Sequence, residues 1–243
     1  MSKKIILLAG PTASGKSKLA VQLAKKLNGE IINADSMQVY REFSILSSRP
    51  DNKDLKKVKH HLYGIIPAKK HFSAGDWLKL AKNRINYCHK FKKIPIIVGG
   101  TGLYFNTITK GISKIPDIDL QTRNKVRNLF KKLGYKIFYK KLLDLDPKVK
   151  NKILPSDSQR SQRAYEVILK TKKSIFDWIA ETKSDFINFE VSKIYLDTPR
   201  DELLKKIYLR TELMFKNDCI KEVKKFNLLK LRNSLSAHKL IGV

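Results

Sequence analysis

The sequence has few cysteines, few acidic residues and no long apolar run, and each scarcity excludes a class of protein. Its two cysteines, Cys88 and Cys219, lie far apart and outside any C-x-x-C pattern, so a disulfide framework or a zinc site is not expected, and a reducing cytoplasm fits. The apolar run at residues 5–9 is too short for the core of a signal peptide, and no segment approaches the ~20 apolar residues of a membrane span. We therefore expect a soluble, cytoplasmic protein that does not bind membranes.

Basic residues, in contrast, are abundant. The 51 lysines and arginines outnumber the 22 aspartates and glutamates, which gives a formal net charge of +29 and an isoelectric point near 10.0. Such a charge suggests a polyanionic partner, with nucleic acid as the leading candidate. A lysine-rich coding bias, which would raise the charge everywhere, is the alternative. The 243 residues, 42% of them hydrophobic, suffice for one large domain or a domain with an insertion.

The stretch GPTASGKS at residues 10–17 completes the pattern G-x-x-x-x-G-K-[ST] between an expected strand and an expected helix. In that setting backbone N–H groups surround phosphate oxygens, the lysine adds a point charge, and the serine hydroxyl can ligate Mg²⁺. A chance Gly/Ser-rich turn is the alternative, but the required context is met. We predict a phosphate site with Ser17 as the magnesium ligand, formed by Gly10, Pro11, Thr12, Ala13, Ser14, Gly15, Lys16 and Ser17.

Four short apolar runs predict buried parallel strands, at residues 5–9, 30–34, 94–98 and 193–196. The helix after the phosphate loop carries Leu19, Leu23 and Leu27 as one apolar stripe, and Gly29 is expected to end it. A second helix is expected over residues 74–91. Strands that alternate with helices indicate an α/β fold with a doubly wound parallel sheet, in which ligands bind at the carboxyl ends of the strands.

Between residues 113 and 189 charged helical segments replace the strands, at 120–133, 137–145 and 159–170. We interpret 113–189 as a helical insertion, mounted on a P-loop α/β core that consists of residues 1–112 and 190–243. A further helix is expected after the last strand, with Asp197 or Thr198 as its cap.

Polar residues follow two of the predicted strands. Asp35 could hold Mg²⁺ through water or accept a proton from a nucleophile, although an Asp-Ser turn or helix cap is the plainer interpretation. Gln38 could pair bidentately with adenine, and Tyr40 could stack or pack. In VGGTGLYF, residues 98–105, Thr101 offers a hydroxyl at the same edge, although such a stretch is more often a tight turn than a site.

The stretch SDSQRSQRAYEV at residues 156–167 opens a helix, with Asp157 or Ser158 as its cap and Arg160 and Arg163 on one face. Two arginines so placed suit phosphates or a nucleic-acid backbone, and solvated charge is the alternative. A metal site at residues 60–61, which are both histidine, is not expected. Neighbouring side chains of a strand point to opposite faces, and no other His, Asp or Glu spacing completes a ligand set.

Together these stretches resemble the tRNA dimethylallyltransferases, also called isopentenyl-pyrophosphate:tRNA transferases. The matching segments occur in family order over nearly all of the chain: GPTASGKS, INADSMQVYR, SSRP, HHLYGI, FSAGDW, IPIIVGGTGLY, SDSQRSQRAYEVI and the basic helix after Thr198. The phosphate loop occurs in many enzymes, whereas its combination with D-S-x-Q-x-Y and V-G-G-T-G-L-Y is specific to this family.

The resemblance implies transfer of the five-carbon group of dimethylallyl diphosphate to the N6 amine of adenosine at position 37 of tRNA, next to the anticodon, with release of diphosphate. It implies that Asp35 is the base, that Lys16 and a Ser17-bound Mg²⁺ stabilise the leaving diphosphate, and that Thr101 contacts the diphosphate or the reacting nucleotide. A monomer is expected. The implied contacts with the anticodon stem-loop are Asp35, Ser36, Met37, Gln38, Thr101, Arg123, Gln159, Arg160, Ser161, Gln162 and Arg163.

Three departures accompany the resemblance. Arg49 stands where the family usually has lysine, and NDCIKEV at residues 217–223 lacks the glycine that is common after the long helix. The family also continues beyond the segment matched by SAHKLIGV, usually with a basic helix that helps to hold tRNA, whereas this sequence ends at Val243. Two alternatives stay open: a small-molecule or nucleoside kinase of the phosphate-loop class, and a non-catalytic RNA-binding module.

Overall fold

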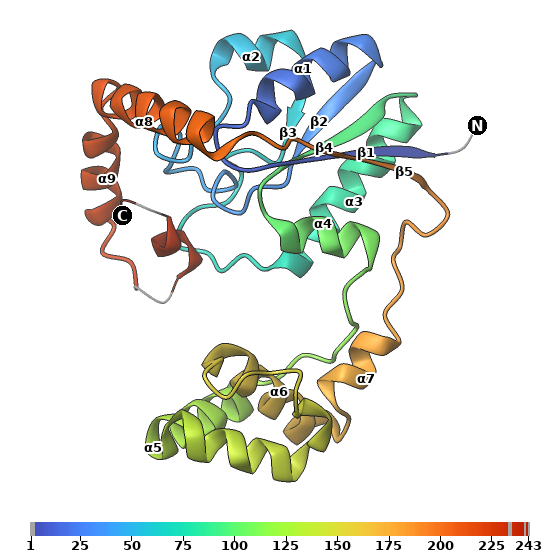
Figure 1. Cartoon of the computed structure of the whole chain (residues 1–243), viewed down its shortest axis with the longest axis vertical. Coiled ribbons are helices and arrows are strands. Elements are labelled where there is room, and N and C mark those ends of the chain that lie inside the picture. The colour runs from blue at the N-terminus through green and yellow to red at the C-terminus, as the bar shows by residue number, and fades with distance from the viewer. Residues whose placement is uncertain (1–2, 233–234, 241, 243) are drawn as a thin grey trace. The chain divides into compact units, whose positions relative to one another are not determined.

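The computed structural model describes residues 3–232, 235–240 and 242, and the chain divides into two compact units (Figure 1). The α/β unit contains the residues up to Thr109 together with those from Phe186 onward, and the helical unit is Lys110–Asp185. The sequence placed the insertion at 113–189. The last matched segment, SAHKLIGV, includes residues 241 and 243, which lie outside the described residues.

The described part of the α/β unit contains a parallel sheet in the order β3-β2-β4-β1-β5. Its strands are β1 (Lys4–Ala9), β2 (Gly29–Asn33), β3 (His60–His61), β4 (Ile94–Gly99) and β5 (Glu190–Tyr195). The predicted doubly wound parallel sheet is therefore confirmed. The two-residue strand β3 was not predicted.

Helices cover both faces of this sheet, as the alternation of side chains along β1 requires. Ile6 and Leu8 pack with α1 (Lys16–Lys26), and α2 (Asn52–Lys57) lies beside that helix. Ile5 and Leu7 point to the opposite face, which α3 (Ala74–Lys90) and α4 (Gly102–Thr109) cover (Figure 1). The expected helix over 74–91 corresponds to α3, which Ser73 and Asp76 begin with a reciprocal capping box.

The expected details of α1 need two corrections. Its buried side chains are Ala20, Val21 and Ala24, while the predicted leucine stripe is only partly buried at the edge of the same cluster. Small side chains bring the helix axis close to the sheet, so the leucines flank the contact. The helix also ends before Gly29, because Asn28 adopts the left-handed backbone (φ 52°) and Gly29 is already the first residue of β2.

The helical unit contains α5 (Leu120–Leu145), the 3-10 turn η1 (Pro147–Val149), α6 (Ser158–Thr171) and α7 (Ile175–Ala180). The two helices predicted at 120–133 and 137–145 are the two halves of α5, which kinks at Gly134 (φ 69°, ψ 169°). Asp119 and Lys170 form an ion pair of 2.9 Å, so the start of α5 lies beside the end of α6.

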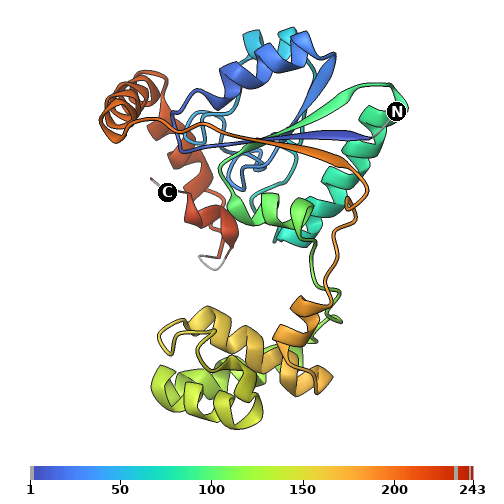
Figure 2. The same cartoon turned by 45° about the vertical axis from the view of Figure 1, so that its right-hand side comes forward.

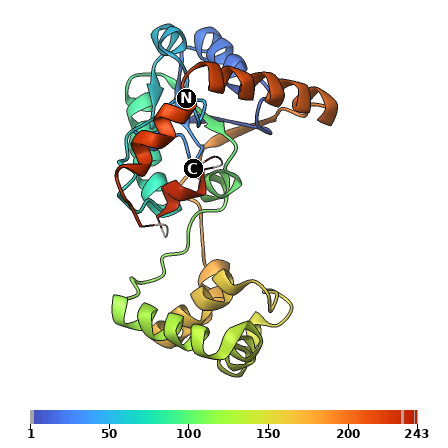
Figure 3. The ribbon, with the colours of Figure 1, turned by 90° about the vertical axis from the view of Figure 1, so that its left-hand side faces the viewer.

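Three further elements complete the α/β unit: α8 (Arg200–Lys216), α9 (Cys219–Asn227) and the 3-10 turn η2 (Ser236–Lys239). They lie at the carboxyl ends of the strands, as Figures 2 and 3 show. The expected cap at Asp197 or Thr198 was wrong, since Pro199 precedes the first helical residue and no side chain caps it. Asp218 adopts the left-handed backbone (φ 64°) between α8 and α9, a conformation that glycine adopts more readily than residues with a side chain.

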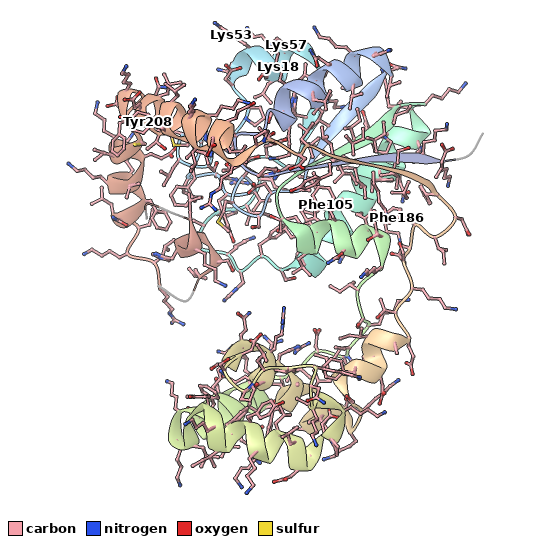
Figure 4. The ribbon with its side chains drawn as sticks, viewed as in Figure 1. Lys18, Lys53, Lys57, Phe105, Phe186 and Tyr208 are labelled. Carbon is pink, nitrogen blue, oxygen red and sulfur yellow. The ribbon has the colours of Figure 1, made fainter. Side chains whose placement is uncertain are left out.

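Within the described residues, none of the helices combines the length and the apolar character that a bilayer crossing requires. Helix α8 buries none of its residues, and Figure 4 shows the side chains along it. Tyr208 on α8, for example, is 66% exposed.

Candidate active site

A cavity of about 740 Å³ opens at the carboxyl ends of β1, β4 and β2, three adjacent strands of the sheet. It brings together the eight predicted phosphate-loop residues, the four residues from Asp35 to Gln38, and Thr101. Residues from the 46–48 loop, α8 and η2 also line it. The complete lining is Gly10, Pro11, Thr12, Ala13, Ser14, Gly15, Lys16, Ser17, Lys18, Asp35, Ser36, Met37, Gln38, Leu46, Ser47, Ser48, Tyr63, Val98, Gly99, Gly100, Thr101, Lys206, Arg210, Lys239 and Leu240.

The phosphate loop leads directly into the first turn of α1. Gly15 (φ 89°) is the residue before the helix, and no side chain caps the N–H groups of that turn. These donors and the helix dipole favour an anion. Lys16 donates through Nζ to the carbonyl of Pro11 and, at 3.5 Å, to Ser14 Oγ. Burial lowers the pKa of Lys16, the carboxylate of Asp35 opposes this shift, and Arg210 adds to it.

Two basic residues of α8 reach the same cavity and were not among the predicted site residues. Arg210 donates through Nη2 to Thr12 Oγ1 at 2.8 Å, and Lys206 lines the cavity one helical turn earlier. Burial lowers the pKa of Arg210, against the effect of Asp35. The sequence does show that Lys206 and Arg210 lie four residues apart and therefore on one face of the helix. Only the fold shows that this face lies beside the phosphate loop.

The carboxylate of Asp35 uses its two oxygens differently. Oδ1 accepts hydrogen bonds from the backbone N–H groups of Met37 (2.9 Å) and Gln38 (3.4 Å), which is the turn considered from the sequence. Oδ2 has no hydrogen-bond partner in the described part of the chain, and Asp35 lines the cavity. The turn therefore holds one oxygen and leaves the other available to a ligand.

The buried side chain of Asn33 fixes the backbone at Asp35. Its Oδ1 accepts from the Asp35 N–H at 2.9 Å, and its Nδ2 donates to the carbonyls of Asp35 (3.0 Å) and Leu62 (3.1 Å). The neighbouring strand approaches closely as well, because a Cβ at Gly99 would stand 2.1 Å from the carbonyl oxygen of Ala34. Only glycine fits there.

Thr101 joins the ends of β4 and β2. Its Oγ1 accepts from the Ser36 N–H at 2.9 Å and donates to Ser36 Oγ at 3.3 Å, while its own N–H donates to the carbonyl of Ala34 at 3.2 Å. The hydroxyl therefore positions the Asp35 segment, and the residue also lines the cavity.

Gln38 donates both N–H bonds of its carboxamide to backbone carbonyls, those of Ser47 (2.9 Å) and Ser48 (3.0 Å). Bidentate pairing with adenine needs one of these N–H groups, so this structure leaves Gln38 only its carbonyl oxygen as an acceptor. Tyr40 is 1% exposed and packs in the core. Of the two roles considered for it, packing is therefore confirmed, and its ring is not available to stack on a ligand in this structure.

The remaining predicted tRNA contacts belong to the helical unit. Arg123 lies on α5 and the other five lie on α6, where Asp157 is the cap and accepts from the Arg160 N–H at 3.0 Å. The side chains of Arg160 and Arg163 are 75% and 39% exposed, whereas Ser161 is 1% exposed and lies inside the unit. A contact of Ser161 with RNA is therefore not available in this structure. On the same helix Gln159 is exposed and Gln162 is half-buried.

Two sets of residues were considered for metals. Ser17 and Asp35 line one cavity, and hydroxyl and carboxylate oxygens suit Mg²⁺ as ligands. His61 has partners on other elements that its spacing in the sequence does not reveal, since candidate ligand atoms of Glu30, His61 and Cys88 lie within 4.8 Å of one another. His61 Nε2 lies 2.6 Å from the Glu30 carboxylate, and burial raises the pKa of Cys88 to about 12, so its thiol stays protonated. These three residues form a buried polar cluster between β2, β3 and α3.

A phosphate loop, a carboxylate and a hydroxyl on three adjacent parallel strands define a P-loop enzyme of the α/β class. Residues 38–243 match the family described as IPP transferase. The chain therefore belongs to the IPP transferase family.

Individual relatives agree with this assignment. A tRNA dimethylallyltransferase of Pelagibacter ubique is 54% identical over 240 residues, which are 99% of this chain and 77% of the relative, and one of Rickettsia bellii is 43% identical over 93% of this chain and 73% of its own length. A solved eukaryotic dimethylallyltransferase acting on tRNA has a TM-score of 0.84 at 28% identity, over 98% of this chain and 59% of that one. The tRNA isopentenylpyrophosphate transferase of Bacillus halodurans has a TM-score of 0.68 at 32% identity, over 99% and 75%.

Proposed function

We propose that this chain transfers the dimethylallyl group of dimethylallyl diphosphate to the N6 amine of adenosine at position 37 of tRNA. The observation that carries the proposal is the single cavity in which the phosphate loop faces a free carboxylate oxygen of Asp35. The names of the four relatives described above support the tRNA substrate and the prenyl group, and none of these four is named a kinase.

The loop amides, Lys16 and Arg210 would bind the diphosphate. As the bond between the allylic carbon and the bridging oxygen breaks, negative charge builds on the leaving group, and these donors stabilise it. Mg²⁺ held through Ser17 would supply further positive charge to the same oxygens. In a kinase the same loop would stabilise attack on phosphorus, whereas here carbon is attacked.

The acceptor is a poor nucleophile, because the lone pair of the adenine N6 is delocalised into the ring. As the carbon–nitrogen bond forms, N6 loses one proton, and Oδ2 of Asp35 is the acceptor we propose. General base catalysis of this kind contributes about 10²- to 10⁴-fold. The adenine has to leave the anticodon stack to reach the cavity, at a cost of a few kcal/mol.

The arginines of the helical unit, Arg123, Arg160 and Arg163, would bind phosphates of the anticodon stem-loop and hold the tRNA. The net charge of +29 supports a polyanionic substrate of this kind. We further propose that the chain acts as a monomer in the cytoplasm, where its two free, buried cysteines stay reduced.

The test is a pair of incubations with label in the transferable group. Dimethylallyl diphosphate labelled in its five-carbon chain is supplied with unmodified tRNA, and ATP labelled in its γ-phosphate is supplied with nucleosides. The proposal expects label in tRNA from the first donor only. Phosphoryl transfer without prenyl transfer would establish the kinase alternative instead.

A further inference from the structure

A carboxylate from the C-terminal part of the chain is bound by backbone amides next to the cavity. Glu222 on α9 accepts four hydrogen bonds from the 44–46 segment. Oε1 accepts from Ser44 N (2.6 Å), Ser44 Oγ (2.8 Å) and Ile45 N (2.9 Å), and Oε2 accepts from Leu46 N (2.8 Å). Burial raises the pKa of Glu222, but these bonds outweigh burial and lower the pKa overall.

The same loop continues into the two carbonyls that hold Gln38. Ser47 and Ser48 accept the two N–H bonds of its carboxamide, and Ser48 has a left-handed backbone (φ 52°), which is unfavourable for a residue with a side chain. Hydrogen bonds within the loop, such as Ser48 N–H to the carbonyl of Ile45 at 2.9 Å, offset part of this cost, and a contact from outside the loop adds to them. Glu222, which lies 176 to 178 residues further along the chain, supplies it at the three amides that precede the carbonyls.

This arrangement fixes which atom Gln38 presents to a ligand. Carbonyls can only accept, so the nitrogen of the carboxamide must face them, and its oxygen is the remaining polar atom. Gln38, Ser47 and Ser48 all line the cavity. The oxygen therefore offers an acceptor that suits an N–H donor, such as an exocyclic amine, and disfavours a carbonyl at that position of a base.

Docking of α9 does not by itself explain these four bonds. Phe226 is 2% exposed and packs on Phe43 with ring centroids 4.7 Å apart, so apolar burial already attaches the helix to the α/β unit. Glu222 instead lies where it orders the loop that carries the two carbonyls.

We propose that Glu222 is a positioning residue, which orders the 44–48 loop so that Gln38 presents its carboxamide oxygen to the amino group of the acceptor base. This inference rests on the proposed function, because it names the residue through which that function selects an amine-bearing base. In the described part of the chain the hydrogen bonds of Glu222 go to residues 44–46 and none goes to the phosphate loop, so we expect its loss to affect the nucleic-acid substrate rather than the diphosphate.

A double-mutant cycle on prenyl transfer tests it, with Glu222→Ala, Gln38→Ala and the double variant. We expect Glu222→Ala to lower kcat/KM for tRNA about 10-fold, to leave the KM for dimethylallyl diphosphate unchanged, and to have little further effect once Gln38 is alanine. Glu222→Gln, which keeps one acceptor oxygen, should recover part of the loss. Glu212→Ala, an equal charge change at an exposed position of α8, should leave activity unchanged.

Multiplicative losses in the double variant, an equal rise in the KM for dimethylallyl diphosphate, or an unchanged rate for Gln38→Ala would overturn the inference. A second measurement does not depend on turnover: the side-chain NH₂ signal of Gln38 in ¹H–¹⁵N spectra. Its exchange with water should rise at least several-fold in Glu222→Ala and not in Glu212→Ala; equal exchange in both would contradict the role of Glu222. Absence of prenyl transfer by the unsubstituted chain would instead count against the proposed function, because the exchange comparison still reports on Glu222.

Discussion

At the scale of single residues, the site separates structural from chemical duties within one side chain. Asp35 holds its turn through Oδ1 and keeps Oδ2 free, while Asn33 and Thr101 fix the backbone on either side. A base has to be held in place without losing its acceptor oxygen, and this division achieves both. Substitutions at Asp35 can therefore separate the turn from the chemistry.

Asp35→Asn keeps an acceptor for the turn but cannot take a proton. We expect turnover to fall at least 100-fold, in line with the loss of a general base, while tRNA affinity and thermal stability change little. Asp35→Ala should be equally inactive and somewhat less stable, because it also removes the bond to Met37. Single-turnover prenyl transfer measures the effect, and more than a tenth of the original rate in either variant would show that Asp35 is not the base.

The lowered pKa of Lys16 predicts how diphosphate binding depends on pH. Burial disfavours the charged ammonium, so the free protein loses this proton at a lower pH than the ordinary value of 10.5, and affinity for an anion should weaken as pH rises through that range. Diphosphate itself also titrates in alkali, so the comparison is with Lys16→Ala. Calorimetry of inorganic diphosphate binding should show that the difference between the two proteins shrinks at alkaline pH, whereas a constant difference would contradict the prediction.

The residues that the sequence could predict belong to short segments, each of which carries a recognisable pattern of its own. The phosphate loop and the Asp35 segment each carry their pattern within ten residues. Arg210, Glu222 and Cys88 have their partners on distant elements, and no spacing along the chain indicates such contacts. Topology alone brings them together.

At the scale of secondary-structure elements, long periodic segments were predictable and short or locally strained ones were not. The strands with apolar runs and the α3 helix match the structure within a few residues. Strand β3 has two residues, too few for a pattern, and it exists because β2 offers it an edge. The predicted cap of α8 was wrong because Pro199 is the residue before the helix, and no side chain caps the first turn.

The kink in α5 gives a prediction at this scale. Gly134 has φ 69° and ψ 169°, a backbone region that residues with a Cβ essentially avoid, while a Cβ there would meet no atom within 4 Å. Gly134→Ala should thus destabilise the helical unit by about 1–3 kcal/mol through backbone strain alone. Amide hydrogen exchange in α5 and α6 measures this. Gly102→Ala, which also enters open space but lies on a regular helix, is the control, and equal protection in both variants would contradict the account.

At the scale of the whole molecule, the excess of positive charge is the property that a long polyanion would sense. Composition alone predicted a polyanionic partner, because lysine and arginine outnumber the acidic residues throughout the chain. It could not say which charges matter. The structure narrows the choice, since it shows how far each charged side chain is exposed: 75% for Arg160 and 39% for Arg163.

Replacing Arg160 and Arg163 together by alanine should weaken tRNA binding and make it less sensitive to salt. Each phosphate contact contributes about one to the slope of log K against log salt, so the slope should fall by about two. Lys131 and Lys132, exposed residues of α5, provide a control with the same charge change. Binding titrations at several salt concentrations measure the slopes, and an equal change in both double variants would mean that only net charge matters.

The central claim is that the phosphate loop holds a leaving diphosphate while Asp35 takes a proton from an adenine amine. Its most direct test is mass spectrometry of the tRNA after reaction with dimethylallyl diphosphate, with fragments that locate the change and a parallel assay of released diphosphate. The account predicts one dimethylallyl group on the adenosine that follows the anticodon, one diphosphate released for each group transferred, and neither with Asp35→Asn. Unchanged tRNA, together with phosphate transfer from ATP to a nucleoside hydroxyl, would contradict it.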